Sequence, residues 1–309
     1  MVLSNKSSVE KFLQYMKNSY VLYLFLLPAV AYIFIFNYIP MYGVQIAFKN
    51  FKAARGIWGS PWVGLVNFQK FLSSPDIWNI LGNTVGISLY SLIVGFPVPI
   101  ILALMLNYIR PLSLKKTIQT VSYAPFFIST VVIAGLLYLL LSPNAGVLNS
   151  FRKSFGLDSV FFLAQPNLFK TIYVLANVWQ NAGWGSIIYI AALSGVSQEL
   201  HEAAISDGAT KLQRIWHIDL PSIQPTIIIL LILRIGQIMN VGFEMTYLLQ
   251  NPMNINSSEV IATYVYKVGL LNIQYGYAAA VGLFNNVINL AFLVFANRIA
   301  KKVTESSLW

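Results

Sequence analysis

The chain has 309 residues, of which 57% are hydrophobic and 10% charged, and its mean hydropathy is +0.66. These values exclude an ordinary soluble domain. A net charge of +10 is compatible with nucleic-acid binding, but the 20 Lys and Arg residues form no basic cluster, which favours anchoring at the cytoplasmic face of a membrane instead. The chain contains no cysteine, so thiolate chemistry and Cys-based metal sites are excluded.

Six apolar runs are long enough to cross a bilayer core of about 30 Å at about 1.5 Å per residue. We place these spans at residues 21–39, 84–106, 120–141, 171–193, 226–249 and 278–296. The first run follows Lys6, Lys11 and Lys17 like a signal peptide, but it is too long for one and lacks a small-residue cleavage site. We therefore predict an all-α integral membrane protein with six transmembrane helices, the first of them retained.

The positive charges predict an orientation for these spans. Of the 20 Lys and Arg residues, 11 lie in connections on the side of the two termini, and 8 are spread over longer connections on the other side. Because short cytoplasmic connections carry an excess of Lys and Arg, we predict that both termini are cytoplasmic. The resulting division is a cytoplasmic segment 1–20, the first span 21–39, an external loop 40–83, a core of five spans 84–296 with a cytoplasmic loop 194–225, and a cytoplasmic tail 297–309.

The fourth predicted span carries a polar face. At helical spacing, four residues fall within about 100° of one another: Asn177, Gln180, Asn181 and Trp184. Trp184 lies about 20 Å into the membrane, which is too deep for the interfacial aromatic belt. Amides and an indole can pair with the hydroxyls and ring faces of a sugar, so this face is a candidate substrate pathway. The alternative is that Asn and Gln form hydrogen bonds between helices.

The polar segment 197–221 follows, between the fourth and fifth spans. It predicts two short helices separated by a turn: Ser197 caps the first, Gly208 supplies the left-handed residue that ends it, and Thr210 with Gln213 forms a capping box for the second. We expect Pro221 to end the pair. On the first helix Leu200, Ala203 and Ala204 share one side, and the small alanine side chains would allow another protein to approach the backbone closely.

The same segment contains a motif with defined spacing. Three residues separate Glu202-Ala203-Ala204 from Gly208, and nine more separate Gly208 from Ile218-x-Leu220-Pro221. This pattern resembles the EAA loop of ABC importer permeases. The resemblance implies the type I ABC importer permease fold and a coupling helix that sits in a groove of a cytoplasmic ATPase subunit. The implied ATPase-coupling residues are Glu202, Ala203, Ala204, Asp207, Gly208 and Pro221. The alternative is an ordinary amphipathic connector.

Further phrases extend the resemblance over most of the chain. The external loop contains MYGVQIAFKNF and GSPWVGL, which are similar to permeases for complex oligosaccharides. Further matches are Ala124-Pro125-Phe126 in the third span and Asn177-Val178-Trp179 in the fourth. In that family the corresponding turns of the fourth span contact sugar, which implies the same role for Asn177, Gln180 and Trp184.

The fifth predicted span holds the one charge near the membrane centre, Arg234. It lies within about 120° of three other polar residues: Gln237, Asn240 and Glu244. On one straight helix Arg234 and Glu244 are about 15 Å apart along the axis and cannot pair. Arg234 therefore needs backbone carbonyls, another subunit or the cargo as its partner. In the sixth span Asn285, Asn286 and Asn289 either extend the lining of the pathway or hold helices together.

The sequence offers no machinery for catalysis. Its two histidines, His201 and His217, both lie in the cytoplasmic loop, where we interpret them as solvated, and neither belongs to a metal-ligand motif. The spans contain no paired carboxylates, and the chain has no G-x-S-x-G elbow. There is also no phosphate-binding loop for ATP. We expect no enzyme activity, no metal and no bound cofactor, with ATP hydrolysed by partner subunits.

The resulting hypothesis is the permease subunit of an ABC importer for an oligosaccharide. The resemblance implies a second related permease, two cytoplasmic ATPase subunits and an extracellular solute-binding protein that delivers the sugar, with alternating access driven by the ATPases. We expect a multi-pass protein of a bacterial plasma membrane, in contact with lipid and with no nucleic-acid partner. The alternatives are an ABC importer permease for another polar solute and, from a different class, a channel or receptor.

Overall fold

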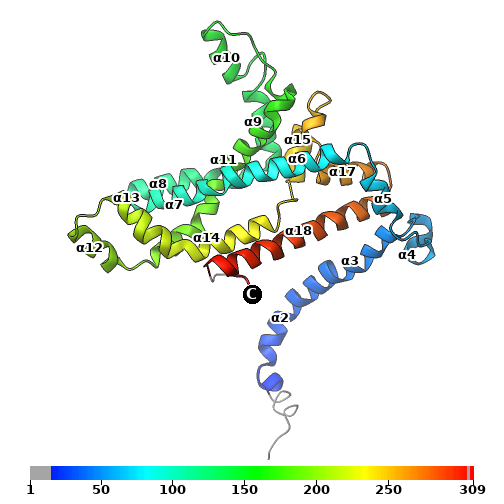
Figure 1. Ribbon diagram of the computed structural model, residues 1–309, viewed down its shortest axis with the longest axis horizontal. Helices are drawn as coiled ribbons and strands as arrows, with labels where there is room; N and C mark the ends of the chain where they lie inside the picture. The colour runs from blue at the N-terminus through cyan, green and yellow to red at the C-terminus, as the bar shows by residue number, and fades with distance from the viewer. Residues whose placement is uncertain (1–14, 305–306) are drawn as a thin grey trace, which may run out of the picture.

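The computed structural model describes residues 15–304 and 307–309, and this part of the chain is helical, with one isolated bridge between Lys49 and Trp62. The α-helices are α2 (Tyr20–Ile33), α3 (Ile39–Met41), α4 (Gly56–Gly59), α5 (Val66–Leu72), α6 (Ile77–Tyr90), α7 (Pro97–Asn107), α8 (Leu112–Tyr123), α9 (Thr130–Leu140), α10 (Val147–Ser154), α11 (Pro166–Ser194), α12 (Gln198–Ser206), α13 (Lys211–Arg214), α14 (Leu220–Ile235), α15 (Phe243–Leu249), α16 (Ile255–Ser258), α17 (Ile261–Tyr266) and α18 (Tyr275–Thr304). Figure 1 shows α7, α11, α14 and α18 forming an elongated body, with α12 at one end.

Several helices have the length and composition of membrane spans. Within the described residues, four long apolar helices cover Tyr20–Phe48, Ile77–Asn107, Lys211–Ile235 and Tyr275–Val303, and a bent pair of helices supplies a fifth span if it is counted as one. Helix α11 has 29 residues and is long enough to cross, but its polar side chains make it less apolar than these. The structure thus supports an all-helical protein with several apolar spans.

The third predicted span is not straight. Residues Leu112–Phe127 and Thr130–Leu140 meet at 99°. Pro125 has no backbone N–H to donate, so the helix tightens into a 3-10 turn at Ala124–Phe127 and stops. After the bend the side chain of Ser129 accepts a hydrogen bond from the Val132 amide and starts α9. As a result the chain turns away from the long axis of the body, and α10 projects from it, as Figure 1 shows.

The prediction of one continuous fifth span over residues 226–249 is wrong. Helix α14 ends at Ile235, residues 236–242 are not helical, and α15 begins at Phe243. Gly236 packs closely against α18: a Cβ there would lie 2.5 Å from Leu293 Cδ1, so a larger residue would require the Leu293 side chain to move. The break places Arg234 and Glu244 on different helices, and their predicted shared face does not exist.

The backbone of this break is satisfied by side chains from neighbouring helices. The Met239 amide donates to Asn289 Oδ1 of α18 at 2.9 Å, and the Gly242 amide donates to the Tyr173 hydroxyl of α11 at 3.0 Å. Non-helical backbone at membrane depth is tolerated only where protein or a water-filled cavity supplies such partners. The break is therefore fixed in place by α11 and α18.

The segment that precedes α6 packs against the N-terminal part of α18. The 3-10 helix Tyr42–Phe48 contacts α18, where Gly276 lets the backbone approach: a Cβ at this position would lie 2.9 Å from the Ile46 carbonyl oxygen. The side-chain amide of Asn67 donates to the carbonyls of Ala47 and Lys49 at 2.8 and 3.1 Å. This segment thus contains ordered helices within the predicted external loop.

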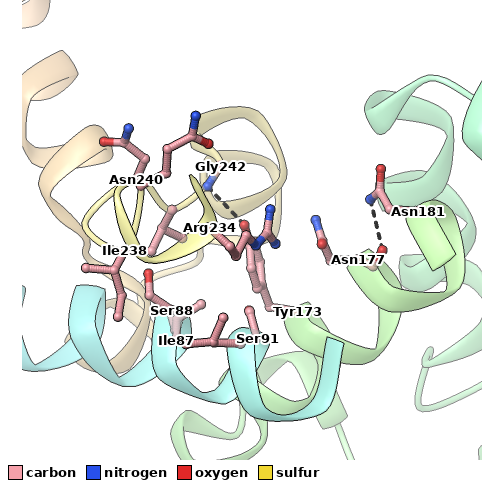
Figure 2. A pocket seen from close by; sticks show the side chains of 13 residues that line it. Ile87, Ser88, Ser91, Tyr173, Asn177, Asn181, Arg234, Ile238, Asn240 and Gly242 are labelled. Atoms are coloured by element: carbon pink, nitrogen blue, oxygen red, sulfur yellow. Dashed lines mark hydrogen bonds between the residues drawn. The ribbon is translucent and has the colours of Figure 1, made fainter. Parts of the chain in front are cut away.

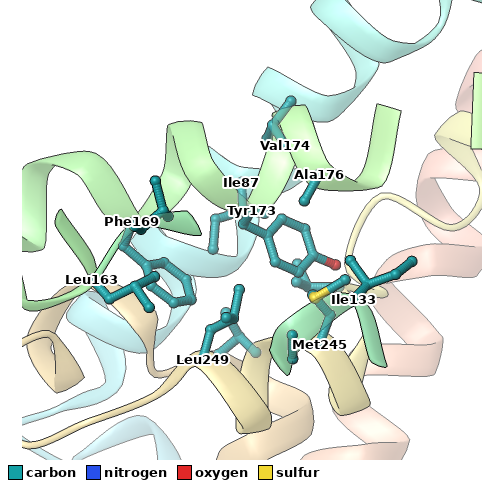
Figure 3. Packing of buried hydrophobic residues seen from close by; sticks show 13 residues of the cluster. Ile87, Ile133, Leu163, Phe169, Tyr173, Val174, Ala176, Met245 and Leu249 are labelled. Carbon is teal, nitrogen blue, oxygen red and sulfur yellow. The ribbon is translucent and has the colours of Figure 1, made fainter. Parts of the chain in front are cut away.

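The largest core described lies where α6, α9, α11 and α15 meet, and Figure 3 shows its side chains. Phe169, Tyr173 and Val174 of α11 pack there against residues of the other three helices, including Ile87, Ile133 and Leu249. Helix α2 differs completely, because none of its residues is buried. The body therefore folds around α11, while α2 leaves all of its apolar surface for lipid or another subunit.

Candidate functional site

A polar cavity of about 310 Å³ lies between α6, α11 and the broken end of α14. Figure 2 shows the side chains that line it: Ile87, Ser88, Ser91, Leu92, Tyr173, Asn177, Asn181, Arg234, Gln237, Ile238, Asn240, Val241 and Gly242. Most of its polar groups come from segments that sequence hydropathy assigns to the membrane interior. Such groups are costly in lipid and are found where they face a cavity or a partner.

Arg234 supplies the charge of this cavity. It occupies the last turn of α14, where the carbonyl end of the helix favours a cation, and its side chain is exposed. In the described part of the chain the ion pairs are His201 with Asp219 and Lys267 with Glu259, so no carboxylate is paired with Arg234. Figure 2 places Arg234 next to Tyr173 and Asn177 of α11. A guanidinium in this position offers several planar donors to an incoming ligand.

The cavity continues along α11 toward the end of the molecule that carries α12. A second hollow of about 240 Å³ shares Ser91, Asn177, Asn181 and Arg234 with the first and extends to Gly185 and Tyr189. The Asn181 amide donates to the Asn177 carbonyl at 2.9 Å, which holds it against its own helix. Together the two hollows extend along α11. Their lining is mostly polar near Gly242 and mostly apolar toward Tyr189.

Two residues of the predicted polar face do not line this cavity. Gln180 donates its side-chain amide to the Ile128 carbonyl at 3.0 Å, and so satisfies the backbone where the third span bends. Trp184 stacks on Phe126 with ring centroids 4.5 Å apart and an interplanar angle of 5°. The face of α11 is therefore divided, with Asn177 and Asn181 toward the cavity and Gln180 and Trp184 toward the bend.

The residues predicted on the fifth span are divided in the same way. Gln237 lines the cavity with Arg234, whereas Glu244 is exposed on α15 and does not line it. Asn240 lies at the rim, where its Oδ1 accepts hydrogen bonds from the amides of Asn285 and Asn289 at 2.9 and 3.0 Å. In the sixth span Asn285 and Asn289 thus hold the broken segment onto α18.

Sequence reasoning missed Ser88, Ser91 and Tyr173 as cavity residues. Ser88 and Ser91 lie three residues apart in an otherwise apolar span, a weak signal that could have marked one face of a helix. Ser91 begins a π-helical turn, Ser91–Gly95, which rotates the following residues relative to a regular helix. No residue pattern in the sequence predicts that turn.

The local structure of the segment 197–214 confirms the predicted caps. The Ser197 hydroxyl accepts a hydrogen bond from the Glu199 amide at 3.2 Å, and Gly208 has φ of 79°. Thr210 and Gln213 form the capping box of α13. These contacts fix the two ends of α12 and the turn that follows it.

The expectation that Pro221 ends the helix pair is wrong. Helices α13 and α14 join through a π-helical turn, Ile215–Asp219, into one helix over Lys211–Ile235. Pro221 lies just after this π turn, and the shifted hydrogen-bond register there accommodates its missing N–H within the continuous helix. The loop therefore continues without a break into the helix that carries Arg234.

Helix α12 exposes an apolar surface at the end of the molecule. Leu200 and Ile205 are each 54% exposed, and Trp216 on the helix that follows is 64% exposed. Glu202 accepts a hydrogen bond from the Gln198 amide at 2.8 Å on the helix surface. Ala203 is exposed and Ala204 is partly buried, while Asp207 closes the helix as its C-cap. Helix α12 therefore presents uncovered apolar side chains next to an acidic one.

Among the described residues, no group of three or more His, Asp or Glu side chains could hold a metal ion. The polar groups of the cavity are amides, hydroxyls and one guanidinium, which bind by hydrogen bonds and charge. The arrangement can therefore recognise a polar or anionic ligand.

Comparison with known proteins identifies the family. Residues 95–305 match the model of "Binding-protein-dependent transport system inner membrane component". The chain is 42% identical to Protein LplB of Bacillus subtilis, over 93% of this chain and 91% of LplB. It is also 42% identical to the polygalacturonan/rhamnogalacturonan transport system permease protein YteP of the same organism, over 93% of this chain and 90% of YteP.

A solved structure has the same fold over almost the whole chain. It is a crystal structure of a bacterial ABC transporter involved in the import of the acidic polysaccharide alginate, with a TM-score of 0.88, 41% identity, and coverage of 95% of this chain and 99% of that one. A second crystal structure of a bacterial alginate ABC transporter, in complex with an alginate pentasaccharide-bound periplasmic protein, matches with a TM-score of 0.88, 40% identity, and coverage of 96% and 99%. The chain belongs to the binding-protein-dependent transport system inner membrane components, the permease subunits of ABC importers.

Proposed function

We propose that this chain is the permease subunit that carries an acidic oligosaccharide across the membrane, in an ABC importer supplied by an external solute-binding protein. The observation that carries the proposal is Arg234, a cation that pairs with no carboxylate of residues 15–304, in a cavity otherwise lined by amides, hydroxyls and apolar groups. The names of YteP and of the alginate transporter point to the same chemical class.

The cavity suits one part of a sugar chain at a time. Its volume of about 310 Å³ is at the lower end of the range for small-ligand sites, about 300–1,000 Å³, so it encloses a portion of an oligosaccharide. Asn177 and Gln237 can pair with hydroxyls, and Arg234 can form two parallel hydrogen bonds to a uronic-acid carboxylate. A neutral sugar would gain the first set of bonds without the second.

The orientation places this cavity between two compartments. In the proposed topology six helices cross a bacterial cell membrane, both termini and α12 are cytoplasmic, and the segment before α6 is external. Helix α11 serves as the fourth span, since its 29 residues can extend about 44 Å. The Lys and Arg bias supports this orientation.

The energy comes from partner subunits. Exposed Leu200, Ile205 and Trp216 support docking of α12 on one of two cytoplasmic ATPases, which hydrolyse the ATP while this chain performs no covalent chemistry and binds no cofactor. The uncovered surface of α2 supports contact with a second related permease and with lipid. ATPase closure moves α12, and the continuous helix Lys211–Ile235 carries that movement to Arg234 and opens the cavity to the delivered sugar.

The test is uptake into proteoliposomes by the purified complex of both permeases, the ATPases and the binding protein. Wild type and Arg234→Gln are compared on an acidic and a neutral oligosaccharide of equal length, with Arg234→Lys as the variant that keeps the charge. We expect Arg234→Gln to lower uptake of the acidic oligosaccharide about tenfold and uptake of the neutral one much less. Arg234→Lys should retain part of the preference for the acidic oligosaccharide. Equal effects on both sugars would contradict the acidic substrate, and uptake without ATP would contradict the importer.

A further inference from the structure

Asp219 is a buried carboxylate at the N-terminal end of α14, and it does not line the transport cavity. Its side chain has 0% exposure. Its Oδ2 accepts a hydrogen bond from the Tyr108 hydroxyl at 2.7 Å, and its Oδ1 lies 3.3 Å from His201 Nε2. The interpretation of His201 as a solvated loop residue is therefore wrong, because its side chain is 19% exposed and faces a carboxylate. His217 is exposed, as expected.

The groups around Asp219 come from three parts of the chain. Tyr108 follows α7, His201 lies on α12, and Arg214 of α13 places its guanidinium carbon 5.3 Å from the centre of the Tyr108 ring. The rings of Tyr108 and His201 meet edge to face at 6.5 Å. Burial raises the pKa of the Tyr108 hydroxyl above its usual value, and the hydrogen bond to Asp219 raises it further, so this hydroxyl remains a proton donor. We refer to Tyr108, His201, Arg214 and Asp219 as the foot cluster.

The folding of the body gives no obvious reason for a carboxylate here. Burying a charge is costly, and a well-packed apolar group in its place is often neutral or stabilising. What the carboxylate provides is attachment, because no residue of α12 is fully buried and α12 has little other hold on the body. Tyr108 joins the end of α7 to Asp219 by a hydrogen bond, and His201 of α12 lies 3.3 Å from the other carboxylate oxygen, where a protonated ring forms an ion pair with it.

Resting on the proposed function, we infer that Asp219 makes α12 move together with α14 and the end of α7, so that ATPase closure reaches the cavity. Asp219 and Arg234 lie on the continuous helix Lys211–Ile235, about 22 Å apart along its axis. If α12 could shift while α14 stayed in place, ATP would be hydrolysed without moving sugar. Asp219, Tyr108 and His201 are thus positioning residues for transport.

The experiment measures sugar transported per ATP hydrolysed in the assembled complex. Tyr108→Phe removes the hydroxyl that donates to Asp219 with little change of shape. His201→Gln removes the imidazole ring that faces the same carboxylate. Asp219→Asn keeps an acceptor oxygen but removes the negative charge. His217→Gln is the matched control, because this histidine is exposed and contacts the Gln213 carbonyl instead. We expect Tyr108→Phe and His201→Gln each to lower the ratio about tenfold at normal assembly, and the control to leave it unchanged. Because the residues act on one carboxylate, the Tyr108→Phe, Asp219→Asn double variant should be no worse than the more severe single variant.

A second measurement tests the attachment itself and needs no sugar. The chain has no cysteine, so Ser206→Cys on α12 and Ser222→Cys on α14 accept a pair of spin labels in the complex. We expect a narrow distance distribution that broadens with Tyr108→Phe. If the distribution stays narrow and the transport ratio is unchanged in Tyr108→Phe and His201→Gln, the inference is overturned. The inference is also overturned if the variants lose assembly, ATPase activity and transport together while the spin-label distance distribution stays narrow. The cluster would then only stabilise the fold. If the transported solute is not an acidic oligosaccharide, the spin-label distances should still change in this way, so the two hypotheses can fail separately.

Discussion

The two ends of α14 carry opposite charges, one buried and one exposed. At its foot, Asp219 is buried and touches Tyr108 and His201. At its other end, Arg234 is exposed to a cavity and has no carboxylate paired with it in the described residues. A buried carboxylate that accepts a hydrogen bond from a neighbouring helix fixes a position, whereas a charge without a partner is available to a ligand. The same helix thus provides both attachment and recognition.

The largest expected effect concerns the helix that Asp219 holds. Gly208 adopts φ of 79°, a conformation that a β-branched side chain strongly disfavours. We expect Gly208→Val to distort the end of α12, prevent ATPase docking and lower ATP-driven uptake more than 100-fold, while the subunit still enters the membrane. Gly156→Val is the matched control, because that glycine also has positive φ but lies far from α12, after α10. Co-purification of the ATPase measures the result, and normal docking in Gly208→Val would remove the coupling role of α12.

A second change gives Arg234 a carboxylate neighbour within the protein. Gln237 lines the cavity with Arg234, so Gln237→Glu introduces a carboxylate that can pair with the guanidinium. We expect uptake of an acidic oligosaccharide to fall about tenfold, because the new carboxylate competes with the substrate and repels it. Uptake of a neutral oligosaccharide should change little. Gln237→Met controls for loss of the amide, and an equal loss for acidic sugar in both variants would show that charge is not responsible.

The broken segment beside Arg234 can be tested through its stability. Asn289 accepts a hydrogen bond from the Met239 amide and donates one to Asn240, and it is 6% exposed. Asn289→Leu leaves both groups without this partner, which costs about 1–3 kcal/mol. We expect earlier thermal unfolding in detergent than for Asn286→Leu, which changes an exposed asparagine on the same helix. Indistinguishable unfolding would mean that these bonds do not hold the segment.

The smallest effect is a pH dependence at the foot cluster. The pKa of Tyr108 is raised in the folded protein above its ordinary value of about 10, first by burial and then by the hydrogen bond to Asp219. Raised pKa values give stability that is complete below the unfolded pKa and is lost as pH rises toward the folded one. We expect the stability difference between wild type and Tyr108→Phe to be constant from pH 7 to 9 and to shrink above about 10. If the stability difference between wild type and Tyr108→Phe grew with pH instead, the pKa of Tyr108 would not be raised in the folded protein.

The parts of the site that follow local rules could be predicted from the sequence. Ser197, Gly208 and the Thr210–Gln213 pair each determine a cap by their own chemistry, and the structure has all of them. The EAA spacing led to the family that the comparisons confirm. Helical periodicity also placed Asn177 and Asn181 together on the side of α11 that faces the cavity.

The remaining features depend on contacts between distant segments. The sequence does not mark the break after Ile235, because Gly236 is tolerated within membrane helices and the residues that bind the broken segment, Tyr173 and Asn289, are far away in sequence. Gln180 was predicted to face sugar, but the bend that exposes the Ile128 carbonyl gives its amide a protein partner. Asp219 is an ordinary loop residue until Tyr108 and His201 are brought to it.

Helix α2 has a consequence for the order in which the protein is made. None of its residues is buried, so its insertion does not depend on contacts with the body. Because α2 precedes the body in the chain, it leaves the ribosome earlier and can enter the bilayer while the helices around Arg234 are still being synthesised. Since lipid is as apolar as its side chains, it gains little by docking early. Targeting to the membrane and folding of the transport machinery can therefore proceed as separate events on one polypeptide.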